Sequence, residues 1–308
     1  MRIFFCLHRF AALILSIYIM DENENKPDTN ARRAAWLEYV AWICAAAAMS
    51  PVFYWLGAAV VDSQQLRDSF IILVVAGIVI AMSHEIRPHR PHFSADSLTA
   101  LCAAYAAFFG AQILGDRLGI IPTLLLTFFG VSAFIVSAGL TCFDRKRYVY
   151  AFGGAFFIFT LLSIAVRIFD LPLRMLAGKL SALVLSLFND TVGLYMMKGN
   201  DPQIAMNVGG TSYLVATECN GFGIISSCIV LSAILTFFGG SRSILKKGAI
   251  VIGSGLIGYI LNSLRIVSII AVAPLAGEKG YFYWHEAFGY FYFAVAMLVV
   301  IWLSRRNP

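Results

Sequence analysis

The stretch Thr217-Glu218-Cys219-Asn220-Gly221-Phe222-Gly223 stands where a polar, turn-rich segment gives way to a long apolar run, residues 224–238. A cysteine at the start of a helix lies in the positive end of the helix dipole, which favours the reactive thiolate over the thiol. Two later residues are also notable: Arg265 lies inside the next apolar run, and His285 opens the last one. If the three reach one side of a membrane, the chain carries a nucleophile, a cation and an imidazole at one site.

The composition indicates an integral membrane protein. Of the 308 residues, 60% are hydrophobic and 13% are charged, whereas a soluble domain carries roughly 25% charged residues. The net charge of +6 is therefore interpreted by position, as loop charge that orients helices, and not as a nucleic-acid interface. The six cysteines show neither a CxxC pair nor metal-ligand spacing, so we expect no metal site, no cofactor and no disulfide framework.

Eight apolar stretches are long enough to cross a lipid bilayer, at about 17–25 residues per crossing. We expect these spans at residues 36–61, 69–83, 97–115, 121–141, 148–167, 213–238, 247–271 and 287–304. Positive residues gather in alternate connections, for example in Arg145-Lys146-Arg147 between spans four and five. The positive-inside rule makes those connections cytoplasmic, so both termini are expected in the cytoplasm. The predicted fold is an all-α polytopic membrane protein in the cell membrane.

The N-terminal residues do not fit this count of spans. Residues 3–20 are apolar, but a crossing there would carry the basic pair Arg32-Arg33 to the outside. Residues 1–35 are therefore interpreted as an N-terminal extension. Its first 19 residues would lie upstream of the true start if the protein begins at Met20.

A second apolar segment, residues 173–188, contains two basic residues, which favours an amphipathic helix on the outer surface over a further crossing. Turn-rich sequence follows, and residues 191–198 and 203–208 are predicted as the strands of a small hairpin before the cysteine. The expected regions after the extension are five spans, an extracytoplasmic interfacial segment and a catalytic three-helix region, at residues 36–168, 169–212 and 213–308.

The predicted topology brings the three polar residues to one depth. Span six runs inward, so Cys219 lies at its outer end, and His285 opens span eight at the same side. Span seven returns from Lys247, and Arg265 lies about 18 residues along it, or some 27 Å at 1.5 Å per residue. Asn262 precedes Arg265 by three positions and shares its helix face. We therefore expect one site at the outer membrane face.

Residue chemistry assigns a role to each member of this site. Cys219 is the nucleophile, and His285 takes the thiol proton and later protonates a leaving amine. Arg265 stays protonated, so it is suited to bind a carboxylate or carbonyl oxygen, or an oxyanion. The neighbouring Glu218 and Glu286 are candidates to orient these groups, although nothing in the sequence fixes that role. The polar neighbours of Cys219 argue against its burial in a dry core.

At these residues the chain resembles the exosortase/archaeosortase family of polytopic membrane transpeptidases. The family has a cysteine motif at the outer end of one helix, an Asn-x-x-Arg motif in the next and a histidine ahead of the last. Here Glu218-Cys219-Asn220-Gly221, Asn262-Ser263-Leu264-Arg265 and His285 match these features. The resemblance is strongest over residues 170–304. Asn220 departs from the more usual serine, which leaves the subfamily open.

The resemblance implies a catalytic site of Cys219, Arg265 and His285, supported by Glu218, Asn220, Asn262 and Glu286. It also implies exported proteins as partners, each with a C-terminal sorting signal made of a short motif, a transmembrane helix and a basic cluster. Cys219 would attack a backbone carbonyl to form a thioester, and an amine-bearing acceptor would then receive the protein.

Other interpretations of the same residues stay open. Taken singly, Cys219 could be a packing residue, Arg265 could snorkel to the interface, and His285 could belong to an interfacial aromatic belt. The chain could be a membrane acyltransferase that uses the same cysteine, or a non-catalytic assembly factor. A small-molecule transporter should carry polar groups at mid-bilayer in several spans, and spans one to five carry few.

Overall fold

Among the residues that the structure describes, eight helical stretches are long and apolar enough to cross a membrane. In the computed structural model they are Trp42–Asp62, Gln64–Ser83, Ala95–Gly115, Ile120–Cys142, Lys146–Val166, Phe222–Gly239, Ile244–Leu275 and Phe282–Arg305. The described residues are 29–305, apart from 89–93, 198–202, 216–218 and 240–242. The predicted all-α polytopic membrane fold is confirmed.

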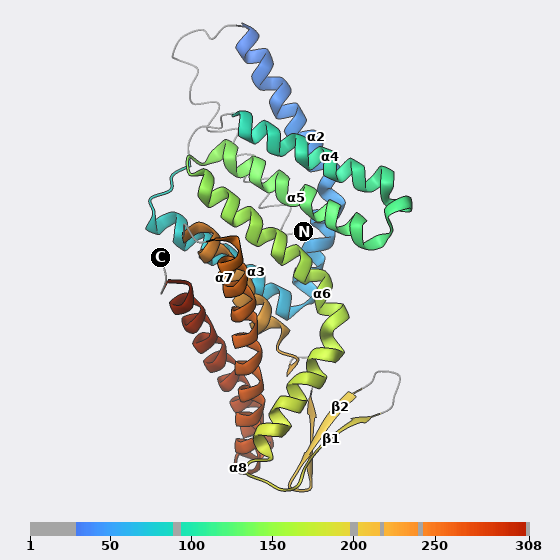
Figure 1. Cartoon of the computed structure of the whole chain (residues 1–308), viewed down its shortest axis with the longest axis vertical. Coiled ribbons are helices and arrows are strands. Elements are labelled where there is room, and N and C mark those ends of the chain that lie inside the picture. Colours follow the sequence, from blue (N-terminus) through green and yellow to red (C-terminus); the bar gives the residue numbers. More distant parts are fainter. Residues whose placement is uncertain (1–28, 89–93, 198–202, 216–218, 240–242, 306–308) are drawn as a thin grey trace. The chain divides into compact units, whose positions relative to one another are not determined.

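The helices that contain these spans are shown in Figure 1: α2 (Thr29–Asp62), α3 (Gln64–Ser83), α4 (Ala95–Leu118), α5 (Ile120–Cys142), α6 (Lys146–Leu185), α7 (Phe222–Gly239) and α8 (Ile244–Arg305). The chain divides into two compact units, residues 1–47 and 48–308. The N-terminal apolar segment 3–20 lies outside the described residues, and so does most of the predicted extension. The second unit contains the candidate site.

Serine caps and one glycine define the short connections between the first helices. Ser63 precedes α3, and its side chain accepts a hydrogen bond from the first turn of that helix. Ser94 and Ser97 form a reciprocal capping box at the start of α4. Gly119 separates α4 from α5 with φ of +79°, a conformation that L side chains rarely adopt. This one-residue connection returns α5 along α4, and the two helices pack together.

Helix α6 is 40 residues long and includes the segment 173–188 almost to its end. The amphipathic helix expected there is present, but it continues the fifth span without a break. A proline inside a helix removes one hydrogen bond, yet α6 continues through Pro172, where Asp170 and Arg174 form an ion pair across it. The end of α6 packs closely on the sheet, because a Cβ on Gly178 would lie 3.0 Å from a leucine side chain of β1. The apolar face of this segment is thus covered in part by protein.

Three antiparallel strands follow α6: β1 (Val192–Met197), β2 (Gln203–Val208) and β3 (Thr211–Val215), in the order β1-β2-β3 (Figure 1). The predicted hairpin of β1 and β2 is confirmed. The third strand was not predicted, and its residues from 213 onward had been assigned to the start of span six. Gly209 and Gly210 both have positive φ, which allows the two-residue turn between β2 and β3. Span six consequently begins at Phe222 and not at residue 213.

The last two spans belong to one continuous element, α8. Two helices meet inside it at Gly277, where φ is +61° and ψ is 177°. Helix α7 packs against α3, α6 and α8. It is the most buried of the eight spans, with 61% of its span residues inside the protein. This central position holds the start of α7, and the loop before it, among several helices.

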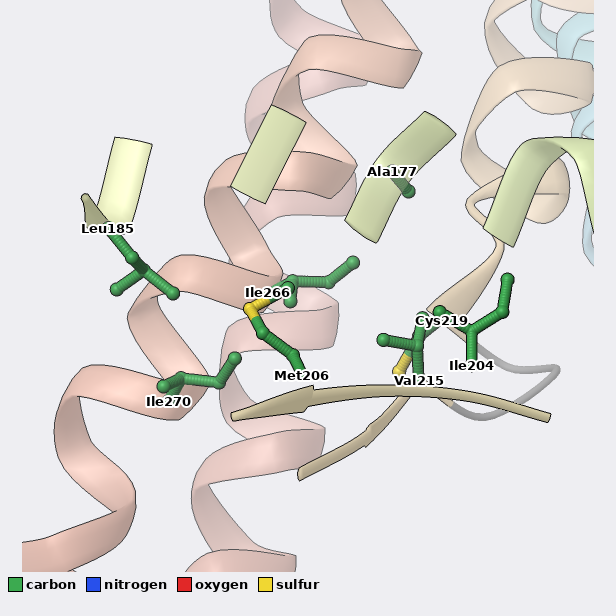
Figure 2. Close-up of a cluster of buried hydrophobic side chains, with 8 residues drawn as sticks. All are labelled: Ala177, Leu185, Ile204, Met206, Val215, Cys219, Ile266 and Ile270. Atoms are coloured by element: carbon green, nitrogen blue, oxygen red, sulfur yellow. The ribbon is translucent and has the colours of Figure 1, made fainter. Parts of the chain in front are cut away.

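A buried apolar cluster lies between the end of α6, the sheet and α8. Figure 2 shows its members converging from these elements, with Cys219 beside Val215 of β3. The other members are Ala177 and Leu185 of α6, Ile204 and Met206 of β2, and Ile266 and Ile270 of α8. The cluster attaches the sheet to the helices at the level of the cysteine.

Candidate active site

Cys219, Arg265 and His285 come from three different parts of the fold and lie together in space. Cys219 precedes α7 by three residues. Arg265 lies in the first helix of α8, and His285 lies in the second helix, after the kink at Gly277. The antiparallel return of α8 is what brings Arg265 and His285 to the same level, as the spacing of the spans predicts.

One nitrogen of His285 contacts both of the other residues. The Sγ atom of Cys219 lies 3.7 Å from Nε2 of His285, and Nη2 of Arg265 lies 3.4 Å from the same nitrogen. A guanidinium has only donors, so Nε2 accepts the hydrogen bond from Arg265. A neutral His285 in this arrangement carries its proton on Nδ1. Its Nε2 lone pair is therefore directed at the group that would deliver a proton, the Cys219 thiol, and at a cation.

Cys219 is buried, contrary to the expectation from its polar neighbours. It is 9% exposed and belongs to the apolar cluster of Figure 2. The strand β3, which the sequence analysis missed, supplies Val215 to this environment. Because the thiol lies among apolar side chains, its chemistry depends on the few polar groups that reach it, first of all His285.

The backbone at Cys219 is held by Asn262 of α8. The Nδ2 atom of Asn262 donates to the carbonyl oxygen of Cys219 at 2.9 Å, and Asn262 is 0% exposed. Gly221 makes this contact feasible: its φ is +77°, and a Cβ there would lie 2.6 Å from Cγ of Asn262. The Oδ1 atom of Asn262 is buried and has no hydrogen-bond partner among the described residues. A buried acceptor of this kind is suited to a donor on a bound ligand or to a water molecule.

Asn220 is a second buried amide in this loop, at 1% exposure. Its Oδ1 accepts from the backbone N–H of Phe222 at 2.8 Å, which caps the start of α7. Oδ1 also accepts from Nε2 of Gln65 at 3.1 Å, and Nδ2 donates to Oδ1 of Asp170 at 2.6 Å. Asp170 is in turn paired with Arg174 at 2.5 Å. The sequence identified Asn220 as a supporting residue but not its partners.

Asp170 and Gln65, the two side-chain partners of Asn220, differ in how far the sequence signals them. Asp170 and Arg174 stand four residues apart in an apolar stretch, so an ion pair on one helix face is a signal that the sequence carries. Gln65 carries no such signal, because it is 155 residues from Asn220 and only the tertiary fold joins them.

The two expected glutamates are not part of these contacts. Glu218 lies outside the described residues. Glu286 is exposed and makes no hydrogen bond or ion pair with any residue that the structure describes, although it lines the cavity beside the site.

A cavity of about 1180 Å³ adjoins Arg265 and His285, whereas Cys219 is not among its lining residues. Arg265, His285 and Asn262 line it, together with Gly221 and Gly223 near the start of α7. Its other charged lining groups are Asp62, Arg67, Asp68, Asp170 and Glu286. The rest of the lining is a mixture of neutral polar side chains, such as Gln64 and Gln65, and apolar ones, such as Trp55, Ile71 and Phe293. Among the described residues no group of three His, Cys, Asp or Glu side chains could hold a metal ion. The cavity is thus an amphipathic space beside a possible nucleophile and its base.

Neither the search of curated proteins nor the search of solved structures finds a match. A family model described as transmembrane exosortase matches residues 61–302, which is well over half of the chain. This range includes all the site residues discussed above, and membership of the family supports a membrane transpeptidase or protease role. The chain belongs to the transmembrane exosortase family.

Proposed function

We propose that this protein is a membrane-embedded cysteine transpeptidase that cleaves the C-terminal sorting signals of exported proteins and transfers the proteins to an amine acceptor. The observation that carries the proposal is the shared contact of His285 Nε2 with the Cys219 sulfur and the Arg265 guanidinium. This arrangement supplies a nucleophile, a general base and a cation within one small volume. The family membership supports the same class of reaction.

The first half-reaction forms a thioester. Nε2 of His285 takes the proton of the Cys219 thiol, and the sulfur attacks the carbonyl carbon of the scissile peptide bond. The carbonyl oxygen becomes an oxyanion in the tetrahedral intermediate, and Arg265 stabilises it. When the intermediate collapses, the C–N bond breaks and the imidazolium gives its proton to the leaving nitrogen.

Proton transfer and oxyanion stabilisation are coupled through Nε2. At rest, the lone pair of this nitrogen accepts a hydrogen bond from Arg265. Once Nε2 holds the thiol proton it can no longer accept, so the guanidinium is free to turn to the new oxyanion. The Nε atom of Arg265 is also buried without a hydrogen-bond partner among the described residues, which leaves a further donor for substrate.

The second half-reaction resolves the thioester. Nε2 of His285 takes a proton from the incoming amine, whose nitrogen attacks the thioester carbonyl. The new C–N bond forms as the C–S bond breaks, and the sulfur recovers its proton from His285. Water in place of the amine gives hydrolysis by the same steps. The basic connections of the chain favour both termini in the cytoplasm and this site on the extracytoplasmic face.

The test is to replace Cys219, Arg265 and His285 singly by alanine and to follow the size and membrane attachment of a candidate sorted protein. We expect the uncleaved form to accumulate in each variant at normal enzyme levels. Cys102→Ser is the matched control, because this exchange removes an exposed thiol on α4, away from the site. Normal processing in the Cys219→Ala strain, with no second enzyme present, would contradict the proposal and favour a transporter or assembly factor. A fatty acyl adduct on Cys219, in place of a peptide adduct, would identify an acyltransferase.

A further inference from the structure

The amide of Asn220 is engaged on both of its polar atoms. Its oxygen accepts two hydrogen bonds, from the Phe222 N–H and from Gln65, and its nitrogen donates to Asp170. These contacts fix which end of the amide faces Asp170, since only the nitrogen end can donate to a carboxylate. The residue immediately after the nucleophile is therefore locked in one orientation.

Asp170 anchors this arrangement to α6. One carboxylate oxygen accepts from Asn220 at 2.6 Å, and the other accepts from Arg174 at 2.5 Å. The side chains of Arg174 and Asp170 are only 14% and 22% exposed. Hydrogen bonds to an ionised group are about twice as strong as neutral ones, so the contact of Asn220 with Asp170 is stronger than its contacts with Gln65 and Phe222.

The loop is held from the opposite side as well. Asn262 of α8 donates to the carbonyl oxygen of Cys219. Side chains from α3, α6 and α8 thus restrain two adjacent residues, Cys219 and Asn220. The direction of the Cys219 Cα–Cβ bond, and with it the position of Sγ, follows from the backbone that these contacts restrain.

We propose that Asp170 is a positioning residue of the active site: acting through Asn220, it fixes the backbone at Cys219 and holds Sγ within reach of His285. The inference deepens the proposed function and rests on it. Asp170 and Gln65 line the same cavity as Arg265 and His285. The side chains that hold Asn220 therefore also form part of the wall of the proposed substrate cavity.

The structure offers a reciprocal exchange as the test. Asn220→Asp alone places two carboxylates 2.6 Å apart, and we expect it to lower kcat by about tenfold or more through repulsion of the two charges. Asp170→Asn in the same chain restores the hydrogen bond between residues 170 and 220 in the opposite direction and keeps an acceptor for Arg174. The new amide donates to residue 220 and its oxygen accepts from Arg174. The double variant should recover kcat to within about threefold of native.

The readout must separate positioning from stability. In Asn220→Asp we expect kcat to fall while KM stays unchanged. We also expect the alkylation rate of Cys219 in the folded, membrane-inserted variant to change, together with the pH profile of that rate. A purely structural contact would lower the thermal unfolding midpoint and leave both quantities unchanged in the folded fraction. Asp96→Asn is the matched control, because it breaks the exposed ion pair of Asp96 with Lys146 away from the site.

Two results would overturn the inference. One is a native kcat and native Cys219 alkylation in Asn220→Asp. The other is a double variant no more active than Asn220→Asp. If Asn220→Asp does not fold, Asp170→Asn compared with the double variant decides the matter, and equal kcat in those two would reject the role. Cys219→Ala keeps the two proposals distinct, because normal processing in that variant rejects the proposed function. The alkylation rate of Cys219, measured in the Asn220 and Asp170 variants, still reports on the role of Asp170.

Discussion

His285 presents one ring nitrogen to two partners, and this geometry distinguishes the roles of Cys219 and Arg265. The thiol can transfer a proton to Nε2, whereas the guanidinium can only donate a hydrogen bond to it. A cation that stabilises the resting base and then an oxyanion needs several donors in a fixed plane. Arginine has them and lysine does not.

Arg265→Lys therefore tests the role of Arg265 more sharply than removal of the side chain. We expect Arg265→Ala to lower kcat by about 10²–10³-fold, as loss of an oxyanion donor does in other enzymes. Arg265→Lys should keep the charge and still lose much of this rate. The measurement is cleavage of a sorted protein by equal amounts of each variant in membranes. Native kcat in Arg265→Lys would show that charge alone suffices.

The backbone at Gly221 leaves no room for a side chain. Its φ of +77° and the 2.6 Å approach of an added Cβ to Asn262 both oppose a side chain. We expect Gly221→Ala to lower the free energy of unfolding by about 1–3 kcal/mol and to displace the Asn262 contact to Cys219. Thermal unfolding in detergent measures the first effect. Gly154→Ala is the control, because nothing lies within 4 Å of that Cβ position in α6. An equal effect in the two variants would contradict the argument.

The sequence predicted which polar residues gather at the site, because each is a polar residue inside or at the end of an apolar run. Close contacts join Cys219, Arg265 and His285, and hydrogen bonds of Asn262 and Asn220 hold the loop of Cys219. The burial of the cysteine and the hydrogen bonds of Asn220 depend on tertiary partners far along the chain. No local pattern encodes such partners, so only the fold supplies them.

At the scale of elements, the kinked α8 sets the distance between Arg265 and His285. Its two helices approach closely at Gly289, where an added Cβ would lie 3.4 Å from Nη2 of Arg265. That distance is an ordinary van der Waals contact for one carbon. A larger side chain at residue 289 would displace the guanidinium.

Gly289→Val and Gly289→Ala form a matched pair of variants on this contact. Alanine fits beside Arg265 and should leave cleavage close to native. The two further methyl groups of valine should shift the guanidinium and lower kcat by about 10- to 100-fold, the range expected for a displacement of about 1 Å. Cleavage rates at equal protein levels test this. A Gly289→Val enzyme as fast as Gly289→Ala would show that Arg265 tolerates displacement.

Prediction from sequence was less complete for the elements between spans five and six. Turn signals located the strands β1 and β2, but β3 merged with the apolar run of α7 and was assigned in part to a helix. The continuation of α6 past Pro172 was also missed, because packing on the sheet and the Asp170–Arg174 pair act across that proline. Both differences arise from tertiary contacts that override local signals.

For the whole molecule, the alternation of basic connections is the argument for orientation. The α5–α6 connection and the start of α6 carry Arg145, Lys146 and Arg147, and the start of α8 carries Lys246 and Lys247. These connections lie at the ends of the spans opposite to the site. The rule that retains lysine and arginine in the cytoplasm therefore predicts that the cavity and His285 lie outside.

Two serines of the second unit test this orientation with the same chemical change. Ser186 follows α6 on the side of the sheet, and Ser243 lies just before α8; both are exposed. In a chain whose native cysteines are replaced, we expect Ser186→Cys to react with a membrane-impermeant maleimide in intact cells. Ser243→Cys should react only after the membrane is opened. The opposite labelling pattern would show that the cavity faces the cytoplasm. An enzyme with that orientation could not reach the exported part of a translocated protein. The orientation and the proposed substrate class therefore depend on the same labelling result.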